Sequence, residues 1–190
     1  MTFAEFAPRF VEDHVLANRL KRSTARRIDN SLRNHLLPVL GAIRLDRIGP
    51  VEIQRLKKRA LASRTINLVL THLTTMLGAA VKWGLLAAAP EITKLKVGKS
   101  PPKFYDFQEY RGLVVSAAQG SAVTHAAVLL GGDAGMRRGE LLALRWQDVD
   151  LRQRRLTVRA NLSAGVIDTP KGGRSRPIPL TPPLRRALAG

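Results

Sequence analysis

Cysteine is absent from this 190-residue sequence, which excludes a disulfide framework, a thiolate metal site and a cysteine nucleophile. The sequence also lacks any apolar run near the roughly 20 residues that a helix needs to span a bilayer. Its first residues, 1–6, do not have the basic-then-apolar order of a secretory signal peptide. We therefore expect a soluble, cytoplasmic protein with no membrane partner.

Metal-ligand spacing is missing as well. The four histidines are widely dispersed along the chain: His14, His35, His72 and His125. The sequence contains no phosphate-binding glycine loop, carboxylate pair or Ser/His/Asp order. We expect no metal and no small-molecule cofactor, and we interpret His35 and His72 as residues of a helix surface or of packing.

Acidic residues are few compared with basic ones: 14 Asp and Glu against 32 Lys and Arg, a net charge of +18. Up to Lys96 there are 17 basic and 7 acidic residues, and after it 15 and 7, so both halves are basic (+10 and +8). Such an excess indicates nucleic acid as the partner, unless the whole proteome is arginine-rich. Aromatic residues make up only 5%, which argues against base stacking on single strands or RNA. Duplex DNA is the expected partner, with self-association on DNA left open.

Apolar residues recur at helical spacing through the first 90 residues. The spacing predicts a first helix from Phe3 to Val15 and a second from an N-cap at Ser23 or Thr24 to Pro38 and Gly41. It also predicts a third helix from Pro50 and a fourth from an N-cap at Ser63 to a C-cap at Gly84. The pattern then lapses between Pro90 and Lys103, which predicts an exposed basic linker.

Periodicity resumes at Phe107 and predicts helices over roughly 107–119, 122–132 and 138–145. After Asp148 the period changes to two, which indicates strands around Leu156 and Ile178, and a last helix begins near Thr181. The sequence therefore predicts a mainly α protein with a small antiparallel β-sheet, divided into residues 1–90, a linker over 91–104, and residues 105–190.

The most informative segment is 133–150. Gly135 interrupts the preceding helix, Arg137 lies at the start of the next one, and an apolar face is expected from Leu141, Leu142, Leu144 and Val149. An arginine fixed at such a boundary can present its planar guanidinium to a phosphate better than a flexible lysine can. Without further context, a surface arginine before a helix is the simpler interpretation.

Residues 134–151 closely resemble the first catalytic arginine box of the tyrosine recombinase (phage integrase) family. Their sequence is A-G-M-R-R-G-E-L-L-A-L-R-W-Q-D-V-D-L. Residues 169–180 are similar to the β-hairpin that carries the family's catalytic lysine. The resemblance implies a helical, SAM-like core-binding domain followed by the N-terminal part of a recombinase catalytic domain. By the same resemblance, Arg137 clamps the scissile phosphate and Lys171 protonates the departing 5′ oxygen. Glu140 is expected to orient Arg137 or to stabilise the helix N-terminus.

Basic residues elsewhere are candidate DNA contacts, although runs of charge are usually solvated faces. Helical spacing relates three of them, which would let one helix face follow a phosphate backbone: Arg22, Arg26 and Arg33. Others cluster near the third helix or follow the catalytic lysine, where contact with the DNA backbone or with solvent is expected: Lys57, Lys58, Arg64, Arg174 and Arg176. A solvated turn lysine is the alternative interpretation of Lys171.

The rest of the family's active site is missing from these residues. None of the histidines begins the family's His-x-x-Arg box, and the only tyrosines, Tyr105 and Tyr110, precede the arginine box, where we assign neither a catalytic role. We expect site-specific recombination through a 3′-phosphotyrosine as the parent activity, with this fragment binding duplex DNA but inactive alone. The alternatives are a non-enzymatic DNA-binding protein, such as a decayed integrase or a regulator, and a general basic architectural or RNA-associated protein.

Overall fold

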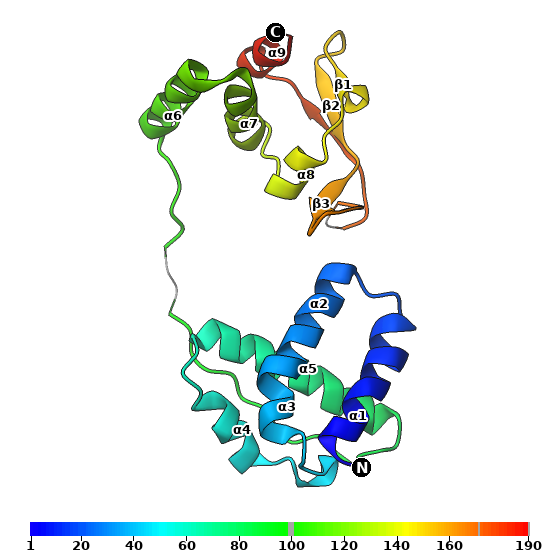
Figure 1. Ribbon diagram of the computed structural model, residues 1–190. Helices are drawn as coiled ribbons and strands as arrows, with labels where there is room; N and C mark the ends of the chain where they lie inside the picture. Colours follow the sequence, from blue (N-terminus) through cyan, green and yellow to red (C-terminus); the bar gives the residue numbers. More distant parts are fainter. Residues whose placement is uncertain (99–100, 171, 190) are drawn as a thin grey trace. The chain divides into compact units, whose positions relative to one another are not determined.

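The computed structural model describes residues 1–98, 101–170 and 172–189, and the chain divides into two compact units, Met1–Ser100 and Pro101–Gly190 (Figure 1). The mainly α fold with small antiparallel sheets confirms the predicted fold class. The domain limits 1–90 and 105–190, as independently folding parts, stay a prediction.

The first unit is entirely helical. Its elements are α1 (Phe3–Phe10), the π-helical turn η1 (Val11–Leu16), α2 (Arg22–Ser31), the π-helical turn η2 (Leu32–Leu36), α3 (Leu37–Leu40), the 3₁₀ turn η3 (Leu45–Arg47), α4 (Pro50–Lys57) and α5 (Ser63–Lys82). The long helix α5 supplies much of the buried core, including Leu70, Leu73, Met76 and Leu77. Phe3, Phe6 and Phe10 from α1 complete that core as apolar side chains with almost no exposed surface.

The helix boundaries follow the sequence signals only in part. Pro50 opens α4 and Gly84 follows α5 in the left-handed region (φ +70°), as predicted. The Leu85 N–H donates to the Ala80 carbonyl (2.9 Å), which completes a glycine-dependent helix end. The predicted N-caps are wrong: α2 has Lys21 as its N-cap, so Ser23 and Thr24 lie inside the helix. Likewise α5 starts after Ala62, with Ser63 as its first residue.

Pro38 does not end the second predicted helix, because the π-helical turn η2 precedes it and α3 continues to Leu40. Proline has no N–H to give to the carbonyl four residues earlier, which belongs to Asn34. Arg59 donates to that carbonyl instead (Nη1 to O, 3.1 Å) and to the carbonyl of His35 (3.2 Å). A side chain distant in sequence therefore satisfies the Asn34 carbonyl, to which Pro38 has no N–H to donate.

The second unit combines helices with two small sheets. Its elements are α6 (Phe107–Gly120), α7 (Ala122–Gly132), α8 (Arg138–Leu142), the 3₁₀ turn η4 (Trp146–Asp148), β1 (Val149–Asp150), β2 (Arg155–Val158), β3 (Asn161–Ser163), β4 (Val166–Asp168), β5 (Arg176–Pro179) and α9 (Pro182–Ala189). One sheet has the order β1-β2-β5, antiparallel throughout, with Leu156 opposite Ile178. The other is the hairpin β3–β4.

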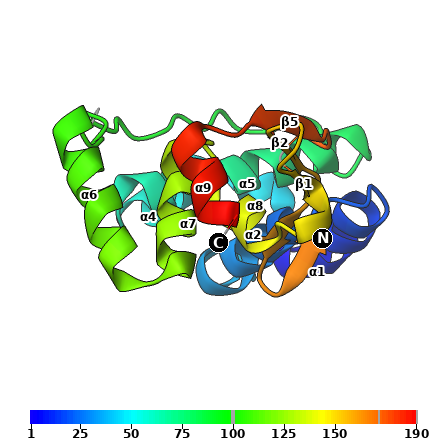
Figure 2. The same ribbon diagram turned by 90° about the horizontal axis from the view of Figure 1, so that it is seen from above.

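The core of the second unit lies where α7 and α9 meet strand β2 (Figures 1 and 2). Its buried side chains include Leu129, Met136, Leu156, Val158 and Leu184. Helix α8 is shorter than the predicted 138–145, because the chain leaves the helix at its C-cap Ala143. Leu142 is consequently 56% exposed, so its predicted place on the apolar face is wrong.

The segment after α5 is not free along its whole length. The side-chain amide of Asn67 pairs with the Leu95 backbone in both directions, donating to its carbonyl (2.9 Å) and accepting from its N–H (2.8 Å). Ile92 and Leu95 also pack against the first unit's core. The predicted exposed linker is therefore anchored to α5 as far as Leu95. In the part of the chain that the structure describes, no helix is long and apolar enough to cross a membrane.

Candidate functional site

Arg137 is held by its backbone at the start of α8. Gly135 adopts the left-handed region (φ +58°), where glycine carries no steric penalty. Met136 turns inward and is 6% exposed, whereas the Arg137 side chain is 60% exposed. Arg137 is the N-cap residue with extended backbone (φ −71°, ψ 150°). The backbone thus buries Met136 and exposes the Arg137 guanidinium to solvent.

Glu140 is the buried partner of Arg137. Its Oε2 accepts from the Arg137 backbone N–H (3.0 Å), which caps α8, and its Oε1 accepts from Arg137 Nη1 (3.1 Å). The Glu140 side chain is only 1% exposed, so its charge depends on these donors. Both alternatives that the sequence left open, orienting Arg137 and stabilising the helix N-terminus, are therefore realised by one carboxylate.

Arg176 reaches the same carboxylate from the start of β5. Its Nη1 donates to Glu140 Oε1 (2.9 Å) and its Nη2 donates to Oε2 (2.6 Å), a bidentate ion pair. Hydrogen bonds from Arg176, together with those from Arg137, lower the pKa of Glu140 to about 2 against the opposing effect of burial. The predicted contact of Arg176 with DNA stays a prediction, but its guanidinium already has a protein partner that sequence reasoning missed.

An open hollow of about 700 Å³ lies beside these residues, lined by Gly135, Arg137, Gly172, Arg174, Ser175 and Arg176. Three guanidinium groups at one hollow provide donors that match the geometry of phosphate oxygens. Arg174 is exposed, consistent with a backbone contact. Gly172 and Gly173 have φ of +98° and +73°, in the left-handed region that glycine adopts without steric penalty. Lys171 itself lies outside the described residues.

Gly139 sets how closely the hairpin β3–β4 approaches α8. A Cβ at this position would lie 2.7 Å from the Leu162 carbonyl oxygen and closer still to the Asn161 side chain. Any larger residue would push the hairpin away from the Arg137 helix. Sequence reasoning passed over Gly139, although a glycine in the first turn of a helix was the available signal.

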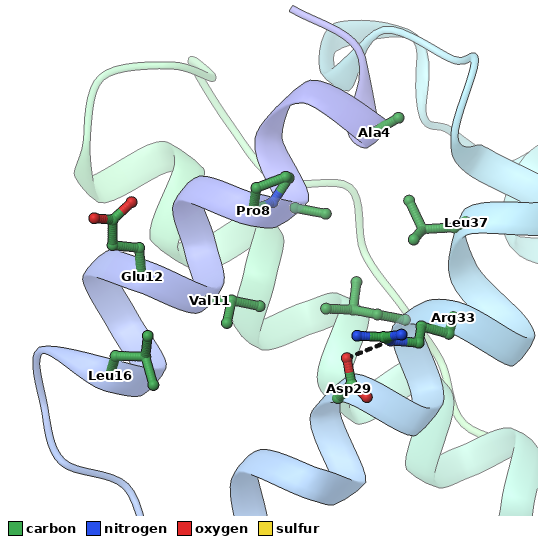
Figure 3. A pocket seen from close by; sticks show the side chains of 10 residues that line it. Ala4, Pro8, Val11, Glu12, Leu16, Asp29, Arg33 and Leu37 are labelled. Carbon is green, nitrogen blue, oxygen red and sulfur yellow. Dashed lines mark hydrogen bonds and ion pairs between the residues drawn. The ribbon is translucent and has the colours of Figure 1, made fainter.

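The predicted basic face of α2 is only partly available. Arg22 and Arg26 are exposed on α2, whereas Arg33 Nε donates to Asp29 Oδ1 (2.7 Å) in an exposed ion pair. This pair lies at a groove of about 560 Å³ between α1–η1 and α2–η2–α3, lined mainly by apolar side chains such as Val11 (Figure 3). Asp29 partly neutralises this face. The described ion pairs do not include Arg22 or Arg26, so these two guanidinium groups are the ones available on the face.

The other candidate contacts of the first unit lie where α4 ends and α5 begins. Lys57 is half-buried, while Lys58 and Arg64 are exposed. His72 is a packing residue, as predicted, since its Nδ1 lies 2.8 Å from the Oγ of the buried Ser31. Within the described ranges, no cluster of three or more His, Cys, Asp or Glu residues could hold a metal ion.

Tyr110 has a structural environment. Its hydroxyl donates to Asp133 Oδ1 (2.7 Å), and Thr181 donates to the other oxygen of Asp133 (2.5 Å). Burial and this carboxylate raise the pKa of Tyr110 to about 12. The network ties α6 and the segment before α9 to the end of α7. Tyr105 is 67% exposed and makes no such contact among the described hydrogen bonds.

Two family models match the chain. The model of the phage integrase N-terminal SAM-like domain matches residues 2–60, and the model of the phage integrase family matches residues 103–189. Together they cover most of the chain, and the second includes Arg137, Glu140 and Arg176. The expected order of a SAM-like domain followed by a catalytic region is thereby confirmed.

Curated relatives are similar to the chain over about two thirds of its length. The shufflon-specific DNA recombinase of Escherichia coli is 29% identical over 142 residues, which is 72% of this chain and 34% of that protein. An Escherichia coli (strain K12) protein whose name describes it as defective, IntQ, is 31% identical over 128 residues, which is 65% of this chain and 32% of that protein. The chain thus spans about a third of the length of these curated relatives.

Solved structures share the fold. A Tn1549 transposon integrase in complex with transposon right-end DNA matches with a TM-score of 0.81 and 22% identity, covering 100% of this chain and 64% of that one. A lambda integrase dimer bound to a COC′ core site matches with a TM-score of 0.69 and 20% identity, covering 94% and 62%. These likenesses show the fold, and the two family models show that the chain belongs to the tyrosine recombinase (phage integrase) family.

Proposed function

We propose that this chain acts in site-specific DNA recombination, binding duplex DNA and supplying part of the recombinase active site. The observation that carries the proposal is the exposed Arg137 guanidinium, which a buried carboxylate holds beside an arginine-lined hollow. The shufflon-specific recombinase, a DNA recombinase by name, and the DNA-bound integrases support the same activity class.

In this proposal Arg137 binds the non-bridging oxygens of the scissile phosphate. The charge on those oxygens grows as the phosphate is attacked, so a donor that is already oriented stabilises the transition state more than the ground state. By family resemblance Lys171 protonates the departing 5′ oxygen, and a tyrosine forms the 3′-phosphotyrosine linkage. No His-x-x-Arg sequence occurs in the 190 residues, and both tyrosines precede Arg137. We therefore infer that this polypeptide alone binds DNA without cleaving it.

The first unit would hold the duplex through its basic surface. Arg22 and Arg26 on α2, with Lys58 and Arg64 near the start of α5, are exposed cations that can neutralise backbone phosphates. Arg33 would contribute only when its pair with Asp29 opens. Since these contacts are to the backbone, they add affinity with little sequence preference.

A second candidate function is a DNA-binding protein without catalysis, such as a decayed integrase or a regulator that occupies recombination sites. The likeness to IntQ, whose name describes it as defective, favours this function. The two functions predict different results when covalent attachment to DNA is measured. A polypeptide extended with a family segment containing His-x-x-Arg and the tyrosine forms a covalent DNA adduct only if the site around Arg137 is still competent.

DNA binding is tested by fluorescence anisotropy with a labelled duplex over a range of salt concentrations. We expect affinity to fall steeply as salt rises, because each neutralised phosphate releases counterions and contributes about 0.9 to the logarithmic slope. Replacing Arg22, Arg26 and Arg33 together by Gln should weaken binding to every duplex and flatten the slope. Arg44→Gln, an exposed arginine paired with Asp46 (3.0 Å), is the matched single control. Salt-insensitive binding, or RNA bound as well as duplex DNA, would contradict the proposal.

A further inference from the structure

The carboxylate of Glu140 is shared by two arginines from distant parts of the sequence. Each oxygen accepts two hydrogen bonds: Oε1 from the Nη1 atoms of Arg137 and Arg176, and Oε2 from the Arg137 N–H and Arg176 Nη2. An ionised carboxylate has about four acceptor positions, so Glu140 is saturated. Arg176 provides two of these four bonds, including the shortest (2.6 Å).

The exposed fraction of the side chain increases from Glu140 to Arg176 to Arg137. Glu140 is 1% exposed, Arg176 is 36% exposed and Arg137 is 60% exposed. Arg176 therefore covers the carboxylate, whereas Arg137 reaches it with a single Nη1 and keeps the rest of its guanidinium at the hollow. A guanidinium carries five donors, so most of those on Arg137 remain available to an incoming phosphate.

We propose that Arg176 is a positioning residue for Arg137: by occupying both oxygens of Glu140, it prevents Arg137 from closing onto the carboxylate and keeps it directed into the hollow. This inference rests on the proposed role of Arg137 in binding phosphate. This role acts through Glu140, and the predicted contact of Arg176 with the DNA backbone stays a separate prediction.

The physical reason is competition for one buried charge. A carboxylate with little exposed surface must have its lone pairs satisfied, and bidentate arginine pairing does this best. Without Arg176, two acceptor positions of Glu140 are left empty, and Arg137, which already bonds the carboxylate through one Nη1, has unused donors to fill them. Arg137 would then form the bidentate pair itself and withdraw its guanidinium from the phosphate site.

The ion pair also joins two segments that contribute to the proposed active site. Arg176 begins β5, five residues after Lys171 in the sequence, while Glu140 belongs to α8, which Arg137 caps. Because Arg176 is paired in the strand with Val158 of β2, its backbone is held in the sheet. The pair therefore ties α8 to the strand β5, which follows Gly172 and Gly173.

The experiment follows Arg137 directly, by the NMR signal of its Nε–Hε group in the 190-residue chain, with inorganic phosphate as the probe. In Arg176→Gln we expect this signal to move in the free protein and the phosphate dissociation constant to rise about tenfold or more, as for loss of a charged hydrogen bond. Arg174→Gln is the matched control, because Arg174 lines the same hollow without a described bond to Glu140. It should weaken phosphate binding and leave the free Arg137 signal in place.

Removing the competing carboxylate separates positioning from simple charge. The double variant Arg176→Gln/Glu140→Gln should bind phosphate more tightly than Arg176→Gln alone. This gain should exceed the gain from adding Glu140→Gln to Arg174→Gln. Both additions change the net charge by the same amount. Equal restoration in the two backgrounds, or an unmoved Arg137 signal in Arg176→Gln, would show that Arg176 is an ordinary contact residue and overturn the proposal. Arg176→Lys, which keeps the charge but not the bidentate geometry, should give an intermediate Arg137 shift.

Failure of the proposed function gives a different result. If the wild-type chain bound neither duplex DNA nor phosphate, the role of Arg137 would be wrong, yet the Arg137 signal in the free variants would still decide whether Arg176 holds it. If Arg176→Gln did not fold, the same comparison would be made with Arg176→Lys, with its thermal unfolding measured in parallel.

Discussion

Arg137 owes its exposure to the residues beside it rather than to its own side chain. Gly135 turns the backbone, Met136 anchors it in the core, and Glu140 draws one guanidinium nitrogen toward the protein. Each of these acts within five residues of sequence, which is why a short motif suffices to describe the site. Arg176 is the exception at this scale, since its bond to Glu140 spans 36 residues.

At the residue scale, the chemistry is tested in a protein extended by a family segment that carries His-x-x-Arg and the tyrosine. The 190-residue chain should form no covalent adduct on a nicked suicide duplex, and the extended protein should form one. There Arg137→Ala should cost about 2.7–4 kcal/mol in the cleavage step, by analogy with loss of one oriented oxyanion donor. Lys171→Ala should slow cleavage less when the leaving oxygen needs no proton.

The matching control for both variants is duplex affinity, which should hardly change because each residue is one contact among many. The assignment of Arg137 to the chemical step would be wrong if Arg137→Ala abolished DNA binding while cleavage by the bound protein continued at its normal rate.

A pH dependence is also expected from Glu140. Its pKa is lower in the folded protein, about 2, than the ordinary 4.5, so the folded state is stabilised above the ordinary value. That stabilisation should be lost as the pH falls from about 5 toward 2, because the unfolded chain then takes up the proton first. Urea unfolding across this range should show a flatter pH dependence for Glu140→Gln than for wild type. Glu91→Gln, an exposed control, should keep the wild-type slope.

At the element scale, short segments are positioned by single side chains that reach between them. Arg59 satisfies the carbonyls of η2, Gly139 lets the hairpin β3–β4 approach α8, and Asp133 joins Tyr110 to Thr181. Such contacts fix elements that are too short to hold their place by buried area alone. Helix α8, for example, spans only Arg138–Leu142.

The pairing of Asn67 with Leu95 predicts where a protease first cuts between the two units. Cleavage after Lys94 requires the Leu95 backbone to leave Asn67, whereas Lys96 and Lys103 are exposed and lie beyond this anchor. Mild trypsin treatment followed by mass spectrometry should therefore show cuts after Lys96 or Lys103 before any after Lys94. Asn67→Ala should make Lys94 an early site as well.

Thr74→Ala provides the control, because Thr74 lies on the same helix and its hydroxyl donates only to the Leu70 carbonyl (2.9 Å) in the described bonds. An early cut after Lys94 in the wild-type chain would mean that the anchor does not persist in solution.

At the scale of the whole molecule, the two units differ in how completely their apolar residues are covered. The first unit has an extensive core built on α1 and α5, whereas the core of the second is small. Large apolar side chains of the second unit remain exposed, including Phe107 (93%), Val123 (79%) and Trp146 (70%).

The second unit should accordingly be the less stable one. Backbone hydrogen exchange is expected to be faster in α6 and α7 than in α5, because fewer buried contacts oppose local opening. Peptide-resolved exchange of the intact chain measures this directly. Equal protection of the two units, or a single protease-resistant product spanning both, would count against independent domains.

Local patterns in the sequence determined most of the elements and the central site residue. The helical period predicted α6 and α7 almost to the residue, Pro50 and Gly84 marked helix ends, and the arginine motif pointed to Arg137 and Glu140. These are short-range effects of backbone geometry and side-chain spacing, so neighbouring residues contain the information.

Only the tertiary structure decided the partners of the charged side chains. Helical spacing pointed to Arg33 as a phosphate contact, and the position of Arg176 after the lysine pointed to the DNA backbone or solvent. The fold adds what the spacing does not contain, namely that Asp29 pairs with Arg33 and Glu140 pairs with Arg176. Both DNA contacts stay predictions. Pro38 lies in the first turn of α3, and Arg59, distant in sequence, donates to the Asn34 and His35 carbonyls before it. A long flexible cation can satisfy any nearby acceptor, so its role depends on which acceptor the folded chain buries within its reach.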